Sequence, residues 1–293
     1  MIGVLPIDKP EGFTSFDVIA KLRGILKIRR IGHSGTLDPM ATGVLPVFIG
    51  RATRAIDLLP DNRKSYIAGF KLGFSTDTQD ISGKTVKTGG KEASLQELQK
   101  ILPEFCGEII QIPPMYSAVK INGSRLYDLA REGKTIERSP RKISIFSLEL
   151  VEFDPDAQSG IMNISCSKGT YIRTLINDIA ERLGSYGTMT SLRRTYSQGF
   201  DISSCLTLSE AQKAADEARL GSLILPIDRC FEFYERLDLN EQDAARYKNG
   251  VRILVSKPKG RYRIYSQDGF IGIGDVLEHE LKTVKNFFGD DLN

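Results

Sequence analysis

Asp38 stands in the stretch 32–46, Gly-His-Ser-Gly-Thr-Leu-Asp-Pro-Met-Ala-Thr-Gly-Val-Leu-Pro, just ahead of an apolar segment. Glycines on both sides of it permit backbone angles that other residues resist, and Pro39 biases Asp38 away from the helical region. A carboxylate held in such a loop can point outward into a cleft, where it is available for chemistry on a bound molecule. The alternative is that Asp38 caps a turn, as Asp-Pro pairs often do.

The other reactive side chains do not suggest a metal or cofactor site. Four cysteines lie far apart without a Cys-x-x-Cys pair, and the two histidines, His33 and His279, are not clustered with them. This pattern indicates neither a zinc site nor a disulfide framework, and it fits a chain with reduced thiols. The glycines near Asp38 lack the spacing of a phosphate-binding P-loop. We therefore expect no metal and no cofactor.

Basic residues are concentrated on both sides of the Asp38 stretch. The net charge of +3 is too small to indicate a class of partner, but the positions of the basic residues along the chain are more informative. The basic residues are Lys21, Arg23, Lys27, Arg29 and Arg30, followed by Arg51, Arg54, Arg63 and Lys64. Such a concentration is expected where phosphates bind, and a solvated helix face is the alternative.

Length and hydropathy bound the class of protein. The 293 residues are enough for one large domain, or for a large and a small one. No stretch approaches the roughly 18 consecutive apolar residues of a membrane helix. The first residues show neither the basic region nor the apolar core of a signal peptide, so we expect a cytoplasmic protein.

Several elements must position Asp38. Residues 3–7 and 44–49 read as strands, separated by a helix that begins near Thr14, and residues 52–59 read as a short helix. The apolar stripe of the first helix is formed by Val18, Ile19, Leu22, Ile25 and Leu26. The basic residues lie mostly off this stripe, which leaves them on the solvent side.

The middle of the chain predicts further strands and helices. Residues 65–72 alternate as a strand with Tyr66 on its apolar face, and residues 73–90 read as loop and turn. A helix from about Thr170 has Arg173 off its apolar stripe, so packing does not explain that arginine. We also expect helices over 94–102, within 122–140 and over 209–220, and strands over 143–151, 161–166 and 188–200.

The character of the chain changes after Pro226. We expect a short helix over 242–248 and strands over 251–255, 261–266 and 270–276, with a hairpin turn at Asp268-Gly269. A small β-rich unit therefore begins near Phe231.

Further segments, taken together, carry a resemblance to a known family. They are Asp8-Lys9-Pro10-Glu11-Gly12, Lys64-Ser65-Tyr66, the run 111–118 (Gln-Ile-Pro-Pro-Met-Tyr-Ser-Ala), the run 167–173 (Ser-Lys-Gly-Thr-Tyr-Ile-Arg) and Leu192-Arg193-Arg194. With the Asp38 stretch, these motifs resemble those of the TruB-type tRNA pseudouridine synthases, in the same order. Each motif is weak alone, but their ordered conjunction from Asp8 to Arg194 is specific.

The resemblance implies a fold and a domain organisation. It implies an α/β (α+β) pseudouridine synthase fold with a mixed, mainly antiparallel sheet over residues 1–230. The basic segment at about 113–145 would form a thumb over RNA, with a solvated surface loop as the alternative. Residues 231–293 look like a small PUA-like RNA-binding β domain.

The resemblance also implies a reaction and three catalytic residues. The substrate would be the uridine at position 55 in the T-loop of tRNA, which becomes pseudouridine. Asp38 would be the nucleophile, attacking either the ribose C1′ or the base C6, and the sequence does not choose between them. Arg173 would keep that carboxylate ionised. Tyr66 would stack on the target base and is a candidate for removing the C5 proton.

The remaining site residues would bind substrate. The resemblance assigns His33 to holding the target nucleotide out of the stack, and Tyr171 and Leu192 to lining the pocket. Lys9 and Lys64 belong to matched motifs and are expected to contact the RNA. In isolation, a lone histidine is more often structural, and a lone tyrosine or arginine is explained by packing or by the surface.

The expected partner is the T-stem-loop of tRNA, bound by a monomer. One rival is a pseudouridine synthase with another RNA target, such as a guide-RNA-dependent relative. A second rival is a non-catalytic tRNA-binding folding chaperone. A third, an Asp-dependent hydrolase, would normally need a second carboxylate or a base, which the matched motifs do not supply.

Overall fold

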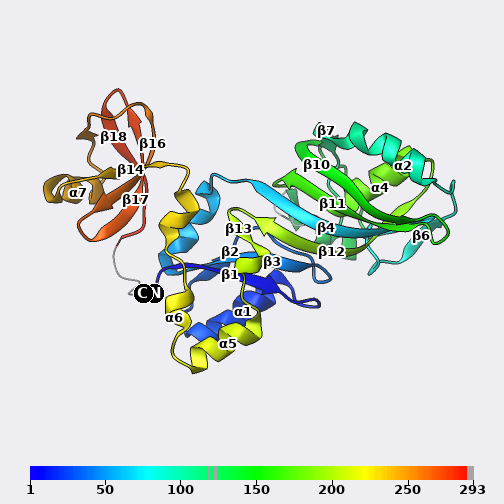
Figure 1. The fold of residues 1–293 in the computed structure, drawn as a ribbon, viewed down its shortest axis with the longest axis horizontal. Coiled ribbons are helices and arrows are strands. Elements are labelled where there is room, and N and C mark those ends of the chain that lie inside the picture. Colours follow the sequence, from blue (N-terminus) through cyan, green and yellow to red (C-terminus); the bar gives the residue numbers. More distant parts are fainter. Residues whose placement is uncertain (118, 122–123, 289–293) are drawn as a thin grey trace.

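The computed structural model describes residues 1–117, 119–121 and 124–288. Part of the predicted thumb, residues 118 and 122–123, lies outside this range. Most of the described chain folds around one large twisted sheet, and a smaller sheet follows it at the C-terminal end (Figure 1).

The large sheet is mixed and mainly antiparallel, as predicted. Its strand order is β1 (Gly3–Lys9), β3 (Thr42–Ile49), β12 (Gly187–Ser197), β4 (Arg63–Leu72), β11 (Ser159–Ser167), β10 (Arg141–Asp154) and β7 (Gly107–Gln111). Short strands β2 (Ile31–His33) and β13 (Phe200–Asp201) pair with β3 and β12. The β12–β3 pair is parallel and the other pairs are antiparallel.

The β1–β3 end of the sheet is covered on both faces. Helices α1 (Ser15–Leu26) and α5 (Leu208–Asp216) pack on one face, against Leu45 and Val47 of β3. The 3₁₀ helices η1 (Gly50–Leu58) and η4 (Ile227–Phe231) pack on the other, against Val44 and Phe48. A strand buried on both faces needs a continuous apolar run, which is what residues 44–49 show.

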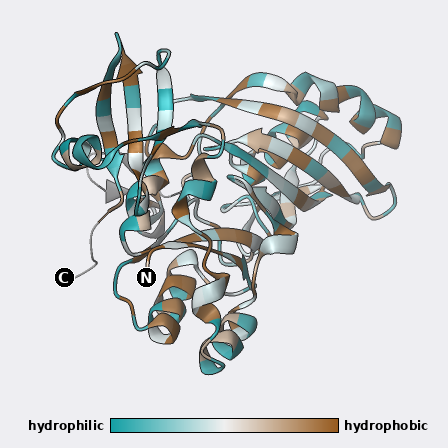
Figure 2. Ribbon diagram, turned by 60° about the vertical axis from the view of Figure 1, so that its left-hand side comes forward, coloured by the Kyte–Doolittle hydropathy of each residue, from teal (hydrophilic) through white to brown (hydrophobic). Residues whose placement is uncertain are grey.

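The other end of the sheet is covered on one face. Helices α4 (Ile172–Arg182) and α2 (Leu95–Ile101), with η2 (Leu102–Phe105), bury the apolar side of β4, β11 and β10. Along these strands, hydrophobic and hydrophilic residues alternate (Figure 2), because successive side chains point to opposite faces. The predicted apolar face of β4, which includes Tyr66, is buried against these helices.

Several local predictions differ from the structure. Residues 73–90 contain a short ribbon of β5 (Phe74–Thr76) and β6 (Thr85–Thr88), because small polar residues can pair outside a core. The predicted strand 188–200 is interrupted at Gln198, where φ is 54°, and the helix 209–220 divides before α6 (Leu220–Leu223) at Ala218, where φ is 56°. Positive φ values break both strand and helix geometry. The predicted helix 52–59 is the 3₁₀ helix η1.

The described part of the segment predicted as a thumb contains only short helices and strands before β10 begins. It contains β8 (Lys120–Ile121), β9 (Ser124–Arg125) and α3 (Leu126–Arg131), and the α3 position agrees with the predicted short helix. Leu126, the first residue of α3, is fully buried.

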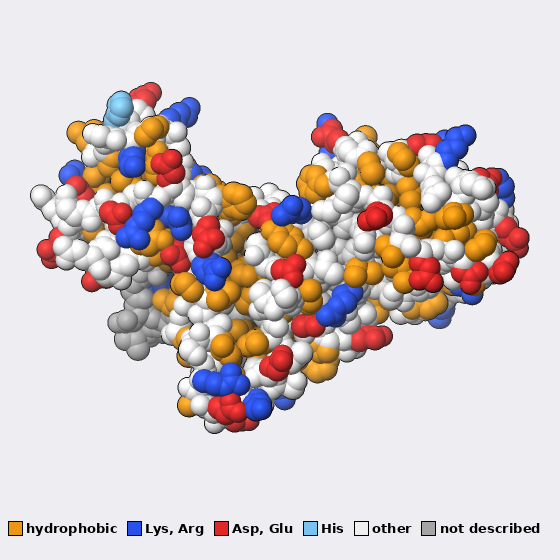
Figure 3. All heavy atoms as spheres, viewed as in Figure 1, with side chains coloured by type: hydrophobic (Ala, Val, Ile, Leu, Met, Phe, Trp, Pro, Cys, Tyr) orange, Lys and Arg blue, Asp and Glu red, His pale blue; other side chains and the backbone are white. Residues whose placement is uncertain are grey.

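The C-terminal unit has its own sheet. The strand order is β14 (Glu235–Asp238), β16 (Gly260–Ser266), β17 (Gly269–Leu277), β18 (Glu280–Asn286) and β15 (Ile253–Leu254), with α7 (Glu241–Lys248) packed against it. Strands β14 and β18 were not predicted, since their sequences are too charged to show an apolar pattern. A concave notch separates this unit from the strand-rich end of the large sheet (Figure 3).

Candidate active site

Asp38 occupies the loop between β2 and β3. The buried Ser15 hydroxyl, at the start of α1, accepts a hydrogen bond from the backbone N–H of Leu37 at 2.9 Å and fixes the residue before Asp38. The Asp38 carbonyl accepts from the N–H of Ala41 at 3.0 Å, so the backbone itself closes the turn. The carboxylate is left for other contacts, and its side chain is 37% exposed.

Lys9 lies beneath this loop. Its side chain is fully buried, and its ammonium donates to the carbonyls of Pro10 at 2.8 Å, Phe13 at 2.6 Å and Pro39 at 3.2 Å. An ammonium has three hydrogens, so these contacts use its donors. Burial and three carbonyls commit the lysine to holding the loop in this conformation, and the predicted contact between Lys9 and RNA stays a prediction.

The Asp38 carboxylate is paired with Arg173. The Nε of Arg173 lies 3.0 Å from Oδ2 of Asp38, and the arginine side chain is only 6% exposed. Its Nη1 donates to the carbonyl of Thr78 at 2.8 Å, and its Nη2 donates to the carbonyl of Tyr116 at 3.0 Å. The guanidinium is thus held by three separate segments, with Nε facing the carboxylate.

Asp80 is the site residue that the sequence analysis missed. Its Oδ2 lies 3.5 Å from Nη1 of Arg173, and both side chains are buried. Its Oδ1 accepts from the Thr78 hydroxyl at 2.8 Å and from the N–H of Ser82 at 3.0 Å. The polar stretch around Asp80 resembles an ordinary turn, and no local signal indicates that it meets a helix nearly a hundred residues later.

The charges around Asp38 act in opposite directions. Burial raises the pKa of the Asp38 carboxyl above its ordinary value, and the anionic Asp80 raises that pKa further. The Arg173 and Lys9 charges lower the pKa and favour the ionised form. Asp38 is therefore a carboxylate whose ionisation depends on its arginine partner.

Two family models cover most of the chain. Residues 23–172 match the TruB family pseudouridylate synthase N-terminal domain, and residues 173–232 match the tRNA pseudouridylate synthase B C-terminal domain. The chain belongs to the TruB family of pseudouridylate synthases. The Asp38 loop and Tyr116 lie in the first match, and Arg173 begins the second.

Relatives extend the similarity over nearly the whole chain. The tRNA pseudouridine synthase B of Clostridium tetani is 41% identical, covering 97% of this chain and 99% of the relative. That of Clostridium kluyveri is 42% identical, covering 98% and 100%. Among solved structures, a Cbf5–Nop10–Gar1 complex matches with a TM-score of 0.74 and 25% identity, covering 98% of this chain and 85% of the matched chain. An H/ACA ribonucleoprotein bound to a substrate RNA has the same score and coverages at 23% identity, which shows the fold alone.

The floor beside the ion pair of this TruB-family chain is apolar. Tyr66, Leu192 and Leu37 belong to one buried cluster, and Tyr66 on β4 is paired with Arg194 on the neighbouring β12. Burial raises the pKa of the Tyr66 hydroxyl, so it stays protonated near neutral pH. Tyr171 immediately precedes α4 and is half-buried, and its backbone is fixed by two hydrogen bonds to the Gln111 side chain.

His33 and Lys64 lie on the strands that flank the Asp38 loop. His33, at the end of β2, makes an edge-to-face contact with Phe16 at 5.5 Å between ring centroids. Lys64, near the start of β4, is on the same strand face as Tyr66. The charge of the Arg194 guanidinium lowers the pKa of both residues, after the larger effect of burial.

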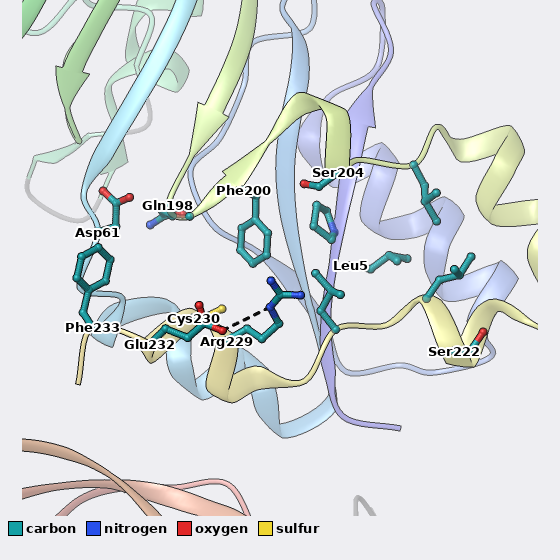
Figure 4. Close-up of a pocket in the computed structure, with 15 residues that line it drawn as sticks. Leu5, Asp61, Gln198, Phe200, Ser204, Ser222, Arg229, Cys230, Glu232 and Phe233 are labelled. Atoms are coloured by element: carbon teal, nitrogen blue, oxygen red, sulfur yellow. Dashed lines mark ion pairs between the residues drawn. The ribbon is translucent and has the colours of Figure 1, made fainter. Parts of the chain in front are cut away.

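A separate cavity lies away from this chemistry. It has a volume of about 420 Å³ and lies between β1, the turn at Gln198 and η4 (Figure 4). Arg229 and Glu232 form an ion pair of 3.7 Å in its wall. The residues that line it do not include Asp38, Tyr66 or Arg173, so it is not the candidate active site.

The described residues show neither a metal-binding cluster nor a membrane-spanning helix. They contain no group of three or more His, Cys, Asp or Glu side chains arranged to hold a metal ion. Nor does any helix in the described ranges have the length and apolar character needed to cross a membrane.

Proposed function

We propose that this chain converts the T-loop uridine at position 55 of tRNA to pseudouridine, with Asp38 as the nucleophile. The observation that carries the proposal is the 3.0 Å pair between the accessible Asp38 carboxylate and the buried Arg173 guanidinium, beside the apolar floor of Tyr66 and Leu192. Membership of the TruB family, together with relatives named tRNA pseudouridine synthase B, supports this substrate class.

The reaction is an isomerisation and needs no external reactant. The N1–C1′ bond breaks, the uracil turns, C5 bonds to C1′, and the proton on C5 is removed while N1 gains one. The ionised Asp38 attacks C1′ or C6 and leaves again when the product forms. Arg173 keeps Asp38 ionised in a site that a base desolvates, and Asp80 orients Arg173.

The apolar floor would receive the extruded base. Tyr66 stacks on the base, Tyr171 and Leu192 line the pocket, and His33 keeps the nucleotide out of the stack. Removing a base from a loop costs a few kcal/mol, which contacts to the RNA backbone must offset.

The remaining RNA contacts are assigned to the thumb and the C-terminal unit. In this proposal, residues 113–145 close over the T-loop, and residues 231–293 act as a PUA-like domain that binds the acceptor arm. Both matched family models end by residue 232, so the PUA-like assignment is supported only by the small β sheet and its basic residues. The enzyme would act as a monomer in the cytoplasm, without a cofactor.

Tritium release from a T-stem-loop RNA labelled at C5 of uridine tests the proposal. We expect the wild type to release tritium and Asp38→Asn to lose about a thousandfold or more of the rate. RNA affinity, measured by filter binding, should remain within about threefold of the wild type, because the amide keeps the size of the side chain. An Asp38→Asn rate close to that of the wild type would refute the nucleophile. Binding without release by the wild type would favour a non-catalytic RNA chaperone.

A further inference from the structure

Arg194 has a buried nitrogen without a partner. The side chain is fully buried on β12, where Nε donates to the carbonyl of Val44 at 2.7 Å and Nη2 donates to the carbonyl of Gly35 at 2.9 Å. Nη1 is also buried and makes no hydrogen bond of normal geometry within the described residues, although the Arg194 guanidinium lies close enough to Tyr66 to favour ionisation of its hydroxyl. A buried charged donor without an acceptor is costly, so this position is suited to an external acceptor.

The Lys64 ammonium lies near Nη1 of Arg194. A Cβ built on Gly35 would lie 2.7 Å from Nζ of Lys64 and 3.4 Å from Nη1 of Arg194, so both nitrogens border one small region. Gly35 has a φ of 71° and no side chain, so the end of the Lys64 side chain can lie directly against the backbone there, beside Nη1 of Arg194. Within the described ranges, Lys64 forms no ion pair with a carboxylate.

His33 adds a third polar group. Its Nδ1 is buried without a hydrogen-bond partner in the described part of the chain. Burial lowers the pKa of His33, and the Arg194 and Lys64 charges lower it further. Burial and then the Arg194 charge lower the pKa of Lys64 to about 8. His33 is therefore neutral near pH 7, and the cations of Lys64 and Arg194 lie close enough to disfavour each other's charge, while Asp38 is paired with Arg173.

We propose that Lys64, Nη1 of Arg194 and His33 form a binding site for one phosphodiester of the RNA, adjacent to the nucleotide that reaches Asp38. A phosphate offers oxygen acceptors and a negative charge, which are what this region lacks. The site shares a strand face with Tyr66, so a phosphate held there would place its neighbouring base toward the apolar floor. The inference rests on the proposed function, because it takes RNA as the ligand.

A methylphosphonate scan tests the phosphate contact directly. T-stem-loop RNAs are prepared with one neutral methylphosphonate at each phosphate flanking the target uridine, and their affinities are measured for wild type and Lys64→Met. We expect one position to lower wild-type affinity about tenfold and to leave the affinity of Lys64→Met unchanged. The Lys64→Met variant should also reduce the slope of log K against log salt by about 0.7–0.9.

Lys71→Met is the matched control. Lys71 is on the same strand but on the opposite, exposed face, so its removal should leave the methylphosphonate effect intact. Lys64→Arg keeps the charge and should retain the positional effect, which separates charge from folding. If Lys64→Met weakens binding equally for every methylphosphonate, or if no position affects the wild type, the phosphate site is wrong. Tritium release by the wild type reports separately on the proposed function.

Discussion

At the scale of single residues, the candidate site depends on how one guanidinium is shared between two carboxylates. Arg173 meets Asp38 through Nε at 3.0 Å and Asp80 through Nη1 at 3.5 Å. The two carboxylates are not equivalent. Asp80 is buried and accepts hydrogen bonds from Thr78 and Ser82, whereas the Asp38 side chain is partly exposed. In the proposed mechanism, Asp80 positions the guanidinium and the accessible Asp38 carboxylate reacts.

The pH dependence of the reaction follows from these charges. Because the pKa of Asp38 is raised, the rate should fall on acidification at a higher pH than for an ordinary aspartate. Asp80→Asn removes an anion that raises this pKa, so the acidic limb should move to lower pH. Arg173→Gln removes the cation that lowers it, so the limb should move to higher pH. Single-turnover tritium release across pH measures both shifts.

The test depends on the two variants moving the acidic limb of the rate in opposite directions along the pH axis. The amide introduced by Asp80→Asn keeps an oxygen for the hydrogen bonds from Thr78 and Ser82, so the loop should stay folded. If both variants lose rate with an unchanged acidic limb, the two residues affect only the structure, and the electrostatic account of Asp38 fails.

At the scale of elements, the site depends on the parallel pairing of β3 with β12. This pairing places Arg194 beside Gly43 and joins the Asp38 loop to the strand that carries Leu192. A Cβ on residue 43 would lie 2.1 Å from the carbonyl oxygen of Arg194, so the two backbones can approach only at a glycine. The loop glycine therefore serves strand pairing as well as turn geometry.

Gly43→Ala should destabilise the fold. Its φ is 102° and the added carbon would meet backbone atoms, so we expect a loss of about 2 kcal/mol or more in the free energy of unfolding. Gly24→Ala is the control, because Gly24 lies in α1 with open space around it and should gain about 0.5–1 kcal/mol. Urea unfolding monitored by circular dichroism measures both. Equal midpoints for the two variants would contradict the close approach.

At the scale of the whole molecule, the C-terminal unit is packed on the large sheet by a shared apolar cluster. Ile273 and Phe287 of this unit are buried together with Val4, Phe48 and Phe231 of the preceding part. The ring of Phe287 lies 6.0 Å from that of Phe231 and 5.6 Å from that of Phe270. The two sheets are separate, but their contact is hydrophobic, which fixes the orientation of the smaller unit.

Phe287→Ala should loosen this contact. Loss of a buried aromatic side chain costs about 3–5 kcal/mol in the free energy of unfolding, and we expect the lower end for a contact between units. Phe233→Ala, at a side chain that is 78% exposed, should change stability by less than about 0.5 kcal/mol. Calorimetry measures both variants. Similar melting temperatures for the two would show that the cluster contributes little to the assembly of the units.

The sequence by itself determined the elements with strong periodicity and the family to which the chain belongs. The apolar run 44–49, the alternation around Tyr66 and the stripe of α4 each predict their structure, because burial imposes period and hydropathy on local sequence. The order of the motifs indicated the family, and the resemblance pointed to Asp38 and Arg173 as candidate catalytic residues.

Only the tertiary structure decided which charges meet. Lys9 is a motif residue whose burial under the loop has no local signal, and Asp80 reads as part of a turn. Arg173 lies off its apolar stripe and is nevertheless buried, because the loop at Thr78 and the carbonyl of Tyr116 cover it. The orphaned nitrogen of Arg194 likewise appears only when β3 and β12 are paired. The interaction between two charges depends on their distance in the folded structure, and that distance cannot be read from their positions in the sequence.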